Sequence, residues 1–361
     1  MLGLLSVLLA LPASAHPAPF TFLDVRVQRD RLELSLVAHV FDVAHDTGLQ
    51  TPEQLFEPAV LEQRGPQFAA LLPERIRFVV DGRSVATSRW SVVEPLPDRQ
   101  SIRLEATAPL DAAPGVIGLT AYLFPYDTAH QTFVNFHDGD TIASQTILDA
   151  ARRDTRFYAG TLAGGLAAAR RVLLGSARHT AFGLEHLAIA IGLLLLATSP
   201  RQLGQLVIAF IAGQLLTMVL GGFAFVLPPQ RLLEPALALA IVYAGADSIM
   251  ASGGRDVRPW MAGAMGGIHG FSLAAQLRTL GFSRLALGWS IAATQVGVGV
   301  TLLLLMWVVR RLFEGVRARG PRAASRLVLA GSALVIVTGV AWFAQLVFLP
   351  ASLLPAFLPR L

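Results

Sequence analysis

Residues 179–198 read HTAFGLEHLAIAIGLLLLAT. An apolar run of this kind meets the roughly 20 residues that a helix needs to cross a hydrocarbon core about 30 Å thick. Its first eight residues nevertheless include His179, Glu185 and His186. Ionisable side chains are costly inside a membrane, so each is by default a candidate for function. The stretch therefore predicts a membrane helix that begins with a group of metal-ligand residues.

The composition of the whole chain indicates two parts in different surroundings. Of its 361 residues, 54% are hydrophobic and 15% are charged, whereas a soluble globular protein is about 25% charged. The chain contains no cysteine, which excludes disulfides and thiolate metal sites. Every basic side chain other than histidine is an arginine, and the formal net charge is +5. We attribute this charge to residues that flank membrane helices rather than to nucleic-acid binding.

The N-terminal part predicts an exported β-domain. Residues 1–15 have an apolar core followed by an A-x-A cleavage pattern, which is typical of a signal peptide. Residues 16–150 contain about eight strand-like runs, such as the alternating RLELSLV at 31–37, and one helical insertion near 52–63. Asp-Gly pairs at 81–82 and 138–139 predict hairpins. We expect an extracytoplasmic β-sandwich-like domain over 16–150.

Histidines of this domain suggest an accessory metal site. If the signal peptide is removed after Ala15, His16 offers both an amine and an imidazole. With a second histidine, these groups form a copper or nickel chelate. The candidates are His16, His45 and His130, and the alternative is that they are scattered surface histidines.

The remainder predicts a basic juxtamembrane linker over 151–178, a six-helix transmembrane domain over 179–350 and a short C-terminal tail over 351–361. The six apolar segments are 179–198, 203–226, 232–250, 259–278, 285–309 and 327–349. The loops expected in the cytoplasm carry more arginine than those expected outside, as the positive-inside rule requires. The predicted fold is a multidomain chain: a β-sandwich-like domain outside the bacterial cytoplasmic (inner) membrane, then a six-helix bundle within it.

Polar side chains in the predicted helices define a candidate metal path. Its members are His179, Glu185, His186, Glu234, Asp247 and His269, with Gln214, Thr217, Thr294 and Gln295 as candidate pore-lining residues. On a straight helix, His179 and His186 share a face but lie about 10 Å apart, too far for one ion with bonds of about 2 Å. Either Gly183 loosens the turn, or the two histidines are successive stops. Estimated along straight helices, the polar side chains lie at different depths in the membrane like the rungs of a ladder. This favours successive binding positions, or stops, that lead towards His269.

Several of these stretches resemble the HupE/UreJ family, in its larger variety with an exported N-terminal domain. The matching stretches are 179–196, 232–247, 266–271 and 287–299 in the membrane part, with VFDVAHDTGL (40–49) and LFPYDTAHQTF (123–133) before it. The resemblance implies six membrane helices and nickel uptake for hydrogenase and urease. The family pattern of histidine, five residues and Asp-His matches His179 and His186, with Glu185 in place of aspartate. A family histidine is replaced by Gln214, and a family Asn and Glu are replaced by Gln295 and Gly299.

The hypothesis is a permease for a divalent transition metal, nickel or cobalt first, and not an enzyme. The metal is substrate and no resident cofactor is expected. The expected partners are that ion, the lipid bilayer and a periplasmic metal-binding or metalloenzyme-maturation protein, without nucleic acid. The alternative is a non-transporting sensor or assembly partner whose β-domain binds metal or a protein. A haem protein with His186 and His269 as axial ligands is a third hypothesis.

Overall fold

The computed structural model describes residues 20–196, 198–250 and 256–348, which form two compact units. One unit comprises residues up to 113 together with 117–155, and the other comprises 114–116 and the chain from 156 onward. The predicted signal peptide, His16 and the predicted C-terminal tail lie outside the described residues.

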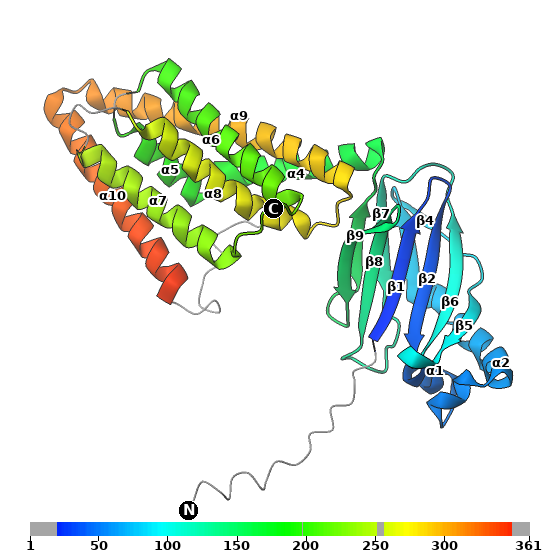
Figure 1. Ribbon diagram of the computed structural model, residues 1–361. Coiled ribbons are helices and arrows are strands. Elements are labelled where there is room, and N and C mark those ends of the chain that lie inside the picture. The colour runs from blue at the N-terminus through cyan, green and yellow to red at the C-terminus, as the bar shows by residue number, and fades with distance from the viewer. Residues whose placement is uncertain (1–19, 197, 251–255, 349–361) are drawn as a thin grey trace, which may run out of the picture. The chain divides into compact units, whose positions relative to one another are not determined.

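The N-terminal unit is β-rich, with strands in two sheets (Figure 1). The first sheet has the strand order β5-β6-β2-β1-β8-β9 and the second has the order β10-β7-β3-β4. The first contains β1 Phe20–Val27, β2 Arg31–His39, β5 Ser91–Leu96, β6 Ser101–Pro109, β8 Gln131–Asp138 and β9 Thr141–Leu148. The second contains β3 Ile76–Val80, β4 Arg83–Val85, β7 Val116–Ala121 and β10 Asp154–Tyr158.

The local sequence patterns explain these strands. In β2, Leu32, Leu34 and Leu36 are all buried, as the alternation of RLELSLV predicts. The Asp-Gly pair at 81–82 joins the antiparallel strands β3 and β4, and both of its residues have positive φ. This conformation matches the twist of a two-residue hairpin. The second Asp-Gly pair lies between the antiparallel strands β8 and β9. Both predicted hairpins are therefore confirmed.

The sheet pairing brings two distant segments to one end of the first sheet. β1 is antiparallel to β2 and parallel to β8, with Phe22 opposite Val37 and Phe20 opposite Gln131. The last residues of β2 therefore lie at the same end of the sheet as the first residues of β8. Helix α1 (Val40–Thr47) follows β2 directly. The predicted helical insertion is also confirmed, as the 3₁₀ turn η1 (Pro52–Phe56) and α2 (Pro58–Ala69), followed by the single turn α3 (Leu72–Arg75).

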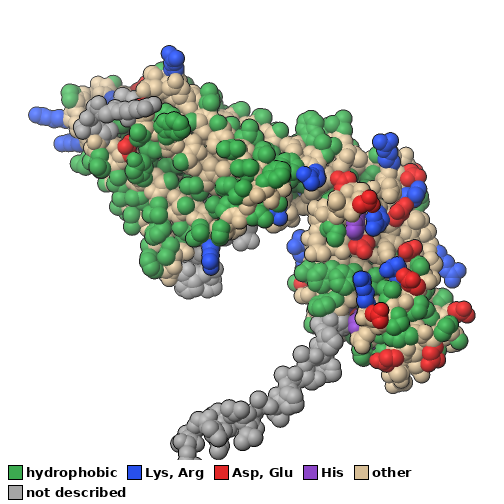
Figure 2. Space-filling model, in the orientation of Figure 1, with side chains coloured by type: hydrophobic (Ala, Val, Ile, Leu, Met, Phe, Trp, Pro, Cys, Tyr) green, Lys and Arg blue, Asp and Glu red, His purple; other side chains and the backbone are tan. Residues whose placement is uncertain are grey.

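The second unit is helical. Its described helices are α4 Leu162–Phe182, α5 Leu184–Leu194, α6 Pro200–Gly222, α7 Gln230–Met250, α8 Arg258–Arg278, α9 Arg284–Arg317 and α10 Pro321–Phe348. Four of these, α6, α7, α9 and α10, are long and apolar enough to cross a membrane. Hydrophobic side chains are spread over the whole visible face of this unit with few acids and bases among them, whereas acids and bases are interspersed over the N-terminal unit (Figure 2).

The start of the helical unit differs from the predicted one. The segment 151–178, expected to be a basic linker, forms β10 and most of α4. The guanidinium of Arg171 donates a hydrogen bond to the hydroxyl of Tyr158 at 2.9 Å, so one of the linker arginines serves packing within this unit. The expected continuous helix over 179–198 is instead divided between the end of α4 and the short α5.

Glycines let the main helix pairs approach closely. The helices pair chiefly as α6 with α8, α4 with α9 and α7 with α10 (Figure 1). A Cβ on Gly213 or Gly266 would overlap a backbone carbonyl of the facing helix, that of Gly263 or Phe210. Small residues at such positions allow close packing of membrane helices. The glycines around His269 therefore set the distance between α6 and α8.

Arginines of two other helices cap the end of α5. Arg258 of α8 donates to the carbonyl of Leu193, and Arg317 of α9 donates to those of Leu194 and Leu195 at 2.9 and 2.7 Å. The last carbonyls of a helix have no partner within the helix. Cationic side chains at that end also interact favourably with the helix dipole. The C-terminal end of α5 is thus held by the helices around it.

Candidate metal centre

The candidate centre begins with the break between α4 and α5. Helix α4 ends at Phe182, and Gly183 takes an extended conformation with φ −69° and ψ 120°. Its N–H still donates to the carbonyl of His179 at 2.7 Å, and its own carbonyl accepts from the N–H of His186 at 3.1 Å. A Cβ at Gly183 would lie 2.5 Å from Oε1 of Glu185 and 2.7 Å from the His179 carbonyl oxygen. The chain therefore turns here at a residue without a side chain.

The break brings the two histidines of the opening stretch together around one carboxylate. Oε1 of Glu185 lies 3.2 Å from Nε2 of His179 and 3.3 Å from Nδ1 of His186. The two imidazole rings have centroids 5.2 Å apart and are nearly perpendicular. All three side chains are buried.

A third histidine comes from α8. The ring of His269 is parallel to that of His179 at 5.6 Å and nearly perpendicular to that of His186 at 4.8 Å, measured between centroids. One ligand nitrogen from each of the three histidines lies within 4.8 Å of the others. The three side chains are buried, and His186 has no exposed surface. We call His179, His186 and His269 the histidine triad.

The triad has the chemistry of a transition-metal site. Nε2 of His186 and Nε2 of His269 have no hydrogen-bond partner among the described residues. Buried polar atoms are nearly always hydrogen-bonded, so such exceptions point to an ion or ligand. Imidazole suits nickel, copper, zinc and iron, and three histidines leave a coordination position open for exchange. An exchangeable site of this kind suits a metal that is substrate rather than resident cofactor. The three imidazole donors fit such a metal.

A comparison with protein families agrees with this arrangement. The family model described as HupE / UreJ protein matches residues 159–346, which is more than half of the chain. The chain belongs to the HupE/UreJ family. Together with the four long apolar helices, the match indicates a membrane protein of that family. No curated protein matches the chain.

In this HupE/UreJ protein, the predicted ladder of successive stops is wrong for the histidines. His179, His186 and His269 lie in one cluster rather than at separate depths. The depth estimate assumed a continuous helix with a rise of about 1.5 Å per residue. The break at Gly183 removes that assumption, and the alternative in which Gly183 loosens the turn is the observed one.

The two predicted pore-lining amides converge on Met218 rather than joining the triad. The side-chain amides of Gln214 and Gln295 both donate to the sulfur of Met218, at 3.7 and 3.2 Å. The Oε1 atoms of these glutamines have no hydrogen-bond partner among the described residues. Gln214 is fully buried.

The two predicted pore-lining threonines bond to their own helices. The hydroxyl of Thr217 donates to the carbonyl of Gly213 and that of Thr294 donates to the carbonyl of Ser290, at 3.1 and 2.8 Å. Such back-bonding uses the only proton that a threonine hydroxyl can donate. These side chains therefore have acceptor capacity alone left for a passing ion.

The two carboxylates of α7 do not join the histidine triad. Glu234 is half-buried near the start of α7 and interacts electrostatically with Glu185. Asp247 lies 13 residues later on the same helix, about 20 Å along its axis. In the described chain, the only group of three or more metal-ligand side chains is the triad.

A pocket of about 380 Å³ reaches the centre from the side of α5, α7 and α10. Its wall is mainly apolar and includes Glu185, Thr338 and Gln345. Glu185 therefore faces the pocket as well as the histidines.

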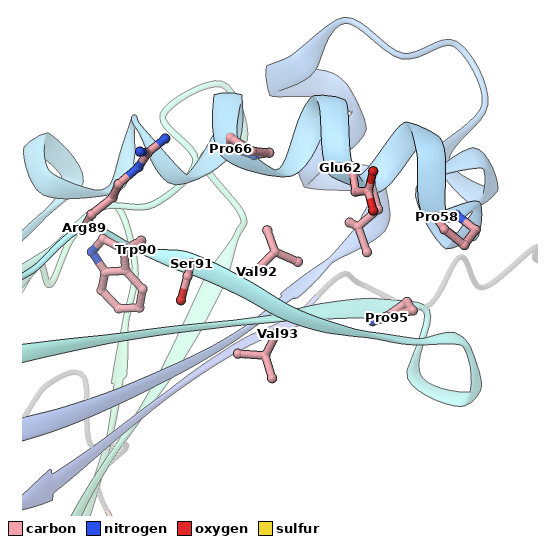
Figure 3. Close-up of a pocket in the computed structure, with 10 residues that line it drawn as sticks. Pro58, Glu62, Pro66, Arg89, Trp90, Ser91, Val92, Val93 and Pro95 are labelled. Carbon is pink, nitrogen blue, oxygen red and sulfur yellow. The ribbon is translucent and has the colours of Figure 1, made fainter.

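A larger pocket of about 690 Å³ lies in the N-terminal unit between α2 and β5, with Arg89 and Trp90 at one end (Figure 3). None of its lining residues is among the predicted site residues.

The N-terminal unit has its own buried ionisable pair, Asp42 and His130. Burial is the main cause that raises the pKa of Asp42 to about 6 and lowers the pKa of His130 to about 4. Burial also raises the pKa of Tyr126, whose hydroxyl donates to Asp42. His45 is exposed and stacks on the ring of Tyr126. His45 and His130 were predicted from the sequence but Asp42 was not, although VFDVAHDTGL contains it.

Proposed function

We propose that this HupE/UreJ protein is a permease for a divalent transition-metal ion, with nickel or cobalt as the first candidates. The observation that carries the proposal is the buried histidine triad at a helix break. We place the helical unit in the bacterial inner membrane and the N-terminal unit outside the cytoplasm, on the signal-peptide pattern and the arginine distribution of the loops.

In this proposal, the helical unit crosses the membrane six times. Helices α6, α7, α9 and α10 supply four crossings. Helices α4 and α5 together supply one interrupted crossing, because α5 alone, with 11 residues, is about 16 Å long. Helix α8 supplies the sixth. Its glycines and polar residues lower its hydropathy, but it packs against both α6 and α7.

An interrupted helix suits the passage of a cation. Transporters commonly bind ions where a helix is broken in mid-membrane and its half-helix ends face the site. Here the C-terminal end of α4, which carries His179, has a partial negative charge that favours a cation. Glu185 lies in the first turn of α5, where the helix dipole favours its negative charge. The break therefore favours both a cation and the carboxylate.

Glu185 would orient the two histidines rather than replace one of them. A carboxylate that accepts a hydrogen bond from one ring nitrogen leaves the other nitrogen for metal. Its Oε1 is within 3.3 Å of a nitrogen on each of His179 and His186. The longer Glu185, in place of the family aspartate, still reaches both rings.

The pocket between α5, α7 and α10 offers a route to the triad. Its wall includes Glu185, and Glu234 interacts electrostatically with that carboxylate. A cation approaching through the pocket would meet the carboxylate of Glu185, which contacts the histidines. The side chains of Thr338 and Gln345 line the same pocket from α10.

The test is metal uptake by proteoliposomes that contain the purified full chain. We expect Ni²⁺ or Co²⁺ to enter, and His186→Ala to remove the uptake. Gly204→Ala in α6 is the matched control, because a Cβ there meets nothing within 4 Å. A wild-type protein that admits neither ion would contradict the proposal, as would an active His186→Ala variant.

A non-transporting sensor or assembly partner is the second candidate. It is favoured by Gln214 and Gly299, which stand where the family resemblance implies histidine and glutamate. That function predicts metal binding by the same purified protein without uptake. The haem hypothesis is not favoured, because the rings of His186 and His269 lie 4.8 Å apart in direct contact, with no space for a porphyrin between them.

A further inference from the structure

Two sequence motifs of the N-terminal unit, VFDVAHDTGL and LFPYDTAHQTF, meet at one end of the strands of the first sheet. The first lies in α1 after β2, and the second precedes β8. The parallel pairing of β1 with β8 brings these segments together. At their meeting point, Oδ2 of Asp42 lies 3.5 Å from Nδ1 of His130. The Asp42 carboxylate has no exposed surface, and the His130 side chain is 3% exposed.

The facing atoms of this pair lack other partners. Oδ2 of Asp42 and both ring nitrogens of His130 make no hydrogen bond within the described chain. The N···O separation of 3.5 Å is longer than the roughly 2.7–3.2 Å of a protein hydrogen bond. Because buried polar atoms are nearly always partnered, a carboxylate oxygen and an imidazole nitrogen left unpaired at this separation point to an ion that both could bind.

A metal ion fits that separation. Two ligand atoms bound at about 2.1 Å to one tetrahedral ion lie about 3.4 Å apart. We propose that Asp42 and His130 form a second divalent-metal site, in the N-terminal unit and separate from the histidine triad. Imidazole nitrogen with carboxylate oxygen suits zinc, cobalt, nickel or copper(II). Water completes the coordination in this assignment.

Neighbouring groups orient both ligands. The hydroxyl of Tyr126 donates to Oδ1 of Asp42 at 2.5 Å, which leaves Oδ2 directed to His130. The His130 ring packs edge-on against Phe124, with centroids 4.6 Å apart. Hydrogen bonds to a ligating carboxylate fix its direction in known metal sites. Tyr126 is therefore a positioning residue.

The local charge also favours a cation. Asp46 and Asp127 both act electrostatically on Asp42 and add to the negative potential there. The guanidinium of Arg75 pairs with Asp46 and donates to a backbone carbonyl. It therefore offsets one carboxylate of the three.

This site differs from the set named from the sequence alone. His45, although near in sequence, has a side chain that is 55% exposed and stacked on Tyr126, with ring centroids 3.5 Å apart. Its Nδ1 lies 3.7 Å from Oδ1 of Asp46. The structure therefore assigns the carboxylate of Asp42, rather than the imidazole of His45, as the partner of His130.

The test measures metal stoichiometry on the full-length protein in detergent, with Co²⁺ and Zn²⁺ as probes. We expect two ions per chain in the wild type, and one in each of His130→Gln and His186→Ala. The double variant should bind none. The Co²⁺ absorption spectrum of the His186→Ala protein reports the N-terminal site alone.

Tyr126→Phe separates metal binding from folding, because it keeps both ligands. We expect the His186→Ala, Tyr126→Phe protein to bind Co²⁺ about 10- to 100-fold more weakly. One ion in the wild type that His186→Ala removes completely would overturn this second site. So would an unchanged stoichiometry in a folded His130→Gln protein. A wild-type protein that binds two ions but transports none would instead count against the transport proposal and leave this second site intact.

Discussion

Gly183→Ala tests whether the helix break builds the metal centre. The substitution adds one methyl group at the junction of α4 and α5. The backbone of Gly183 is extended with φ −69°, which alanine also adopts, so the effect is steric rather than conformational. The new Cβ would meet Oε1 of Glu185 at 2.5 Å and the carbonyl oxygen of His179 at 2.7 Å.

The required displacement can be worked from these distances. Ordinary van der Waals contact begins at 3.4 Å, so the His179 carbonyl, at 2.7 Å, must move by about 0.7 Å. Glu185 is buried, and its carboxylate must move by a similar distance. Metal–ligand distances tolerate only about 0.2 Å. We therefore expect a loss of at least tenfold in Co²⁺ affinity, which is about 1.4 kcal/mol.

The assay is titration of the purified protein with Co²⁺, followed by calorimetry and by the visible absorption of bound cobalt, with every variant made in the His130→Gln background so that the triad alone binds cobalt. Gly204→Ala in α6 is the matched control, because a Cβ there meets nothing within 4 Å. This control should bind cobalt as the wild type does. A Gly183→Ala protein with wild-type affinity and spectrum would refute the argument that the break sets the triad geometry.

Three further predictions use other parts of the molecule. Gly266→Ala should separate α6 from α8 and destabilise the protein by about 1–3 kcal/mol in thermal unfolding, since its Cβ would overlap the carbonyl of Phe210, whereas Gly267→Ala should not. His39 caps α1 by accepting from a backbone N–H, and burial lowers its pKa below 6.5, so this stabilisation is present above pH 6.5 and is lost as the pH falls below it. The protection factors of the α1 amides against hydrogen exchange, which correct for the intrinsic pH dependence of exchange, should fall over that range in the wild type but not in His39→Asn. The chain has no cysteine, so the Gln345→Cys variant carries a single reactive thiol in the wall of the pocket. Modification of this thiol by a thiol reagent should block uptake.

The strands and hairpins were predictable because their determinants are local. Alternation over Leu32, Leu34 and Leu36 identifies β2 and its buried face, and the Asp-Gly pairs identify two turns. The order of strands was not predictable. It depends on the parallel pairing of β1 with β8, which joins residues more than a hundred positions apart.

The histidine triad was only partly predictable. All three histidines stand out in apolar surroundings, so each could be named from the sequence. Their clustering depends on the extended backbone at Gly183 and on the packing that brings His269 of α8 against the two histidines of α4 and α5. Neither feature has a periodic signature, because a glycine in an apolar run is equally compatible with a continuous helix.

The basic segment before the first predicted span was interpreted wrongly for a different reason. Its arginines interrupt the hydropathy, so α4 does not resemble a membrane helix in sequence. In the structure, α4 packs along α9, and Arg171 bonds to Tyr158. Asp42 was missed because an acid in a short amphipathic helix ordinarily faces water, and its burial results from tertiary contacts.

Because arginines cap its C-terminal end, α5 can pivot around that end. Arg258 and Arg317 hold its C-terminal carbonyls, while the helix is interrupted at Gly183, whose N–H keeps a single hydrogen bond to the His179 carbonyl of α4. His186 lies about 12 Å from the capped end at 1.5 Å per residue, so a tilt of about 10° around that end moves it by about 2 Å. That motion exceeds by far the tolerance of a metal–nitrogen bond. A small rocking of this one short helix would therefore be sufficient to change the geometry of the triad.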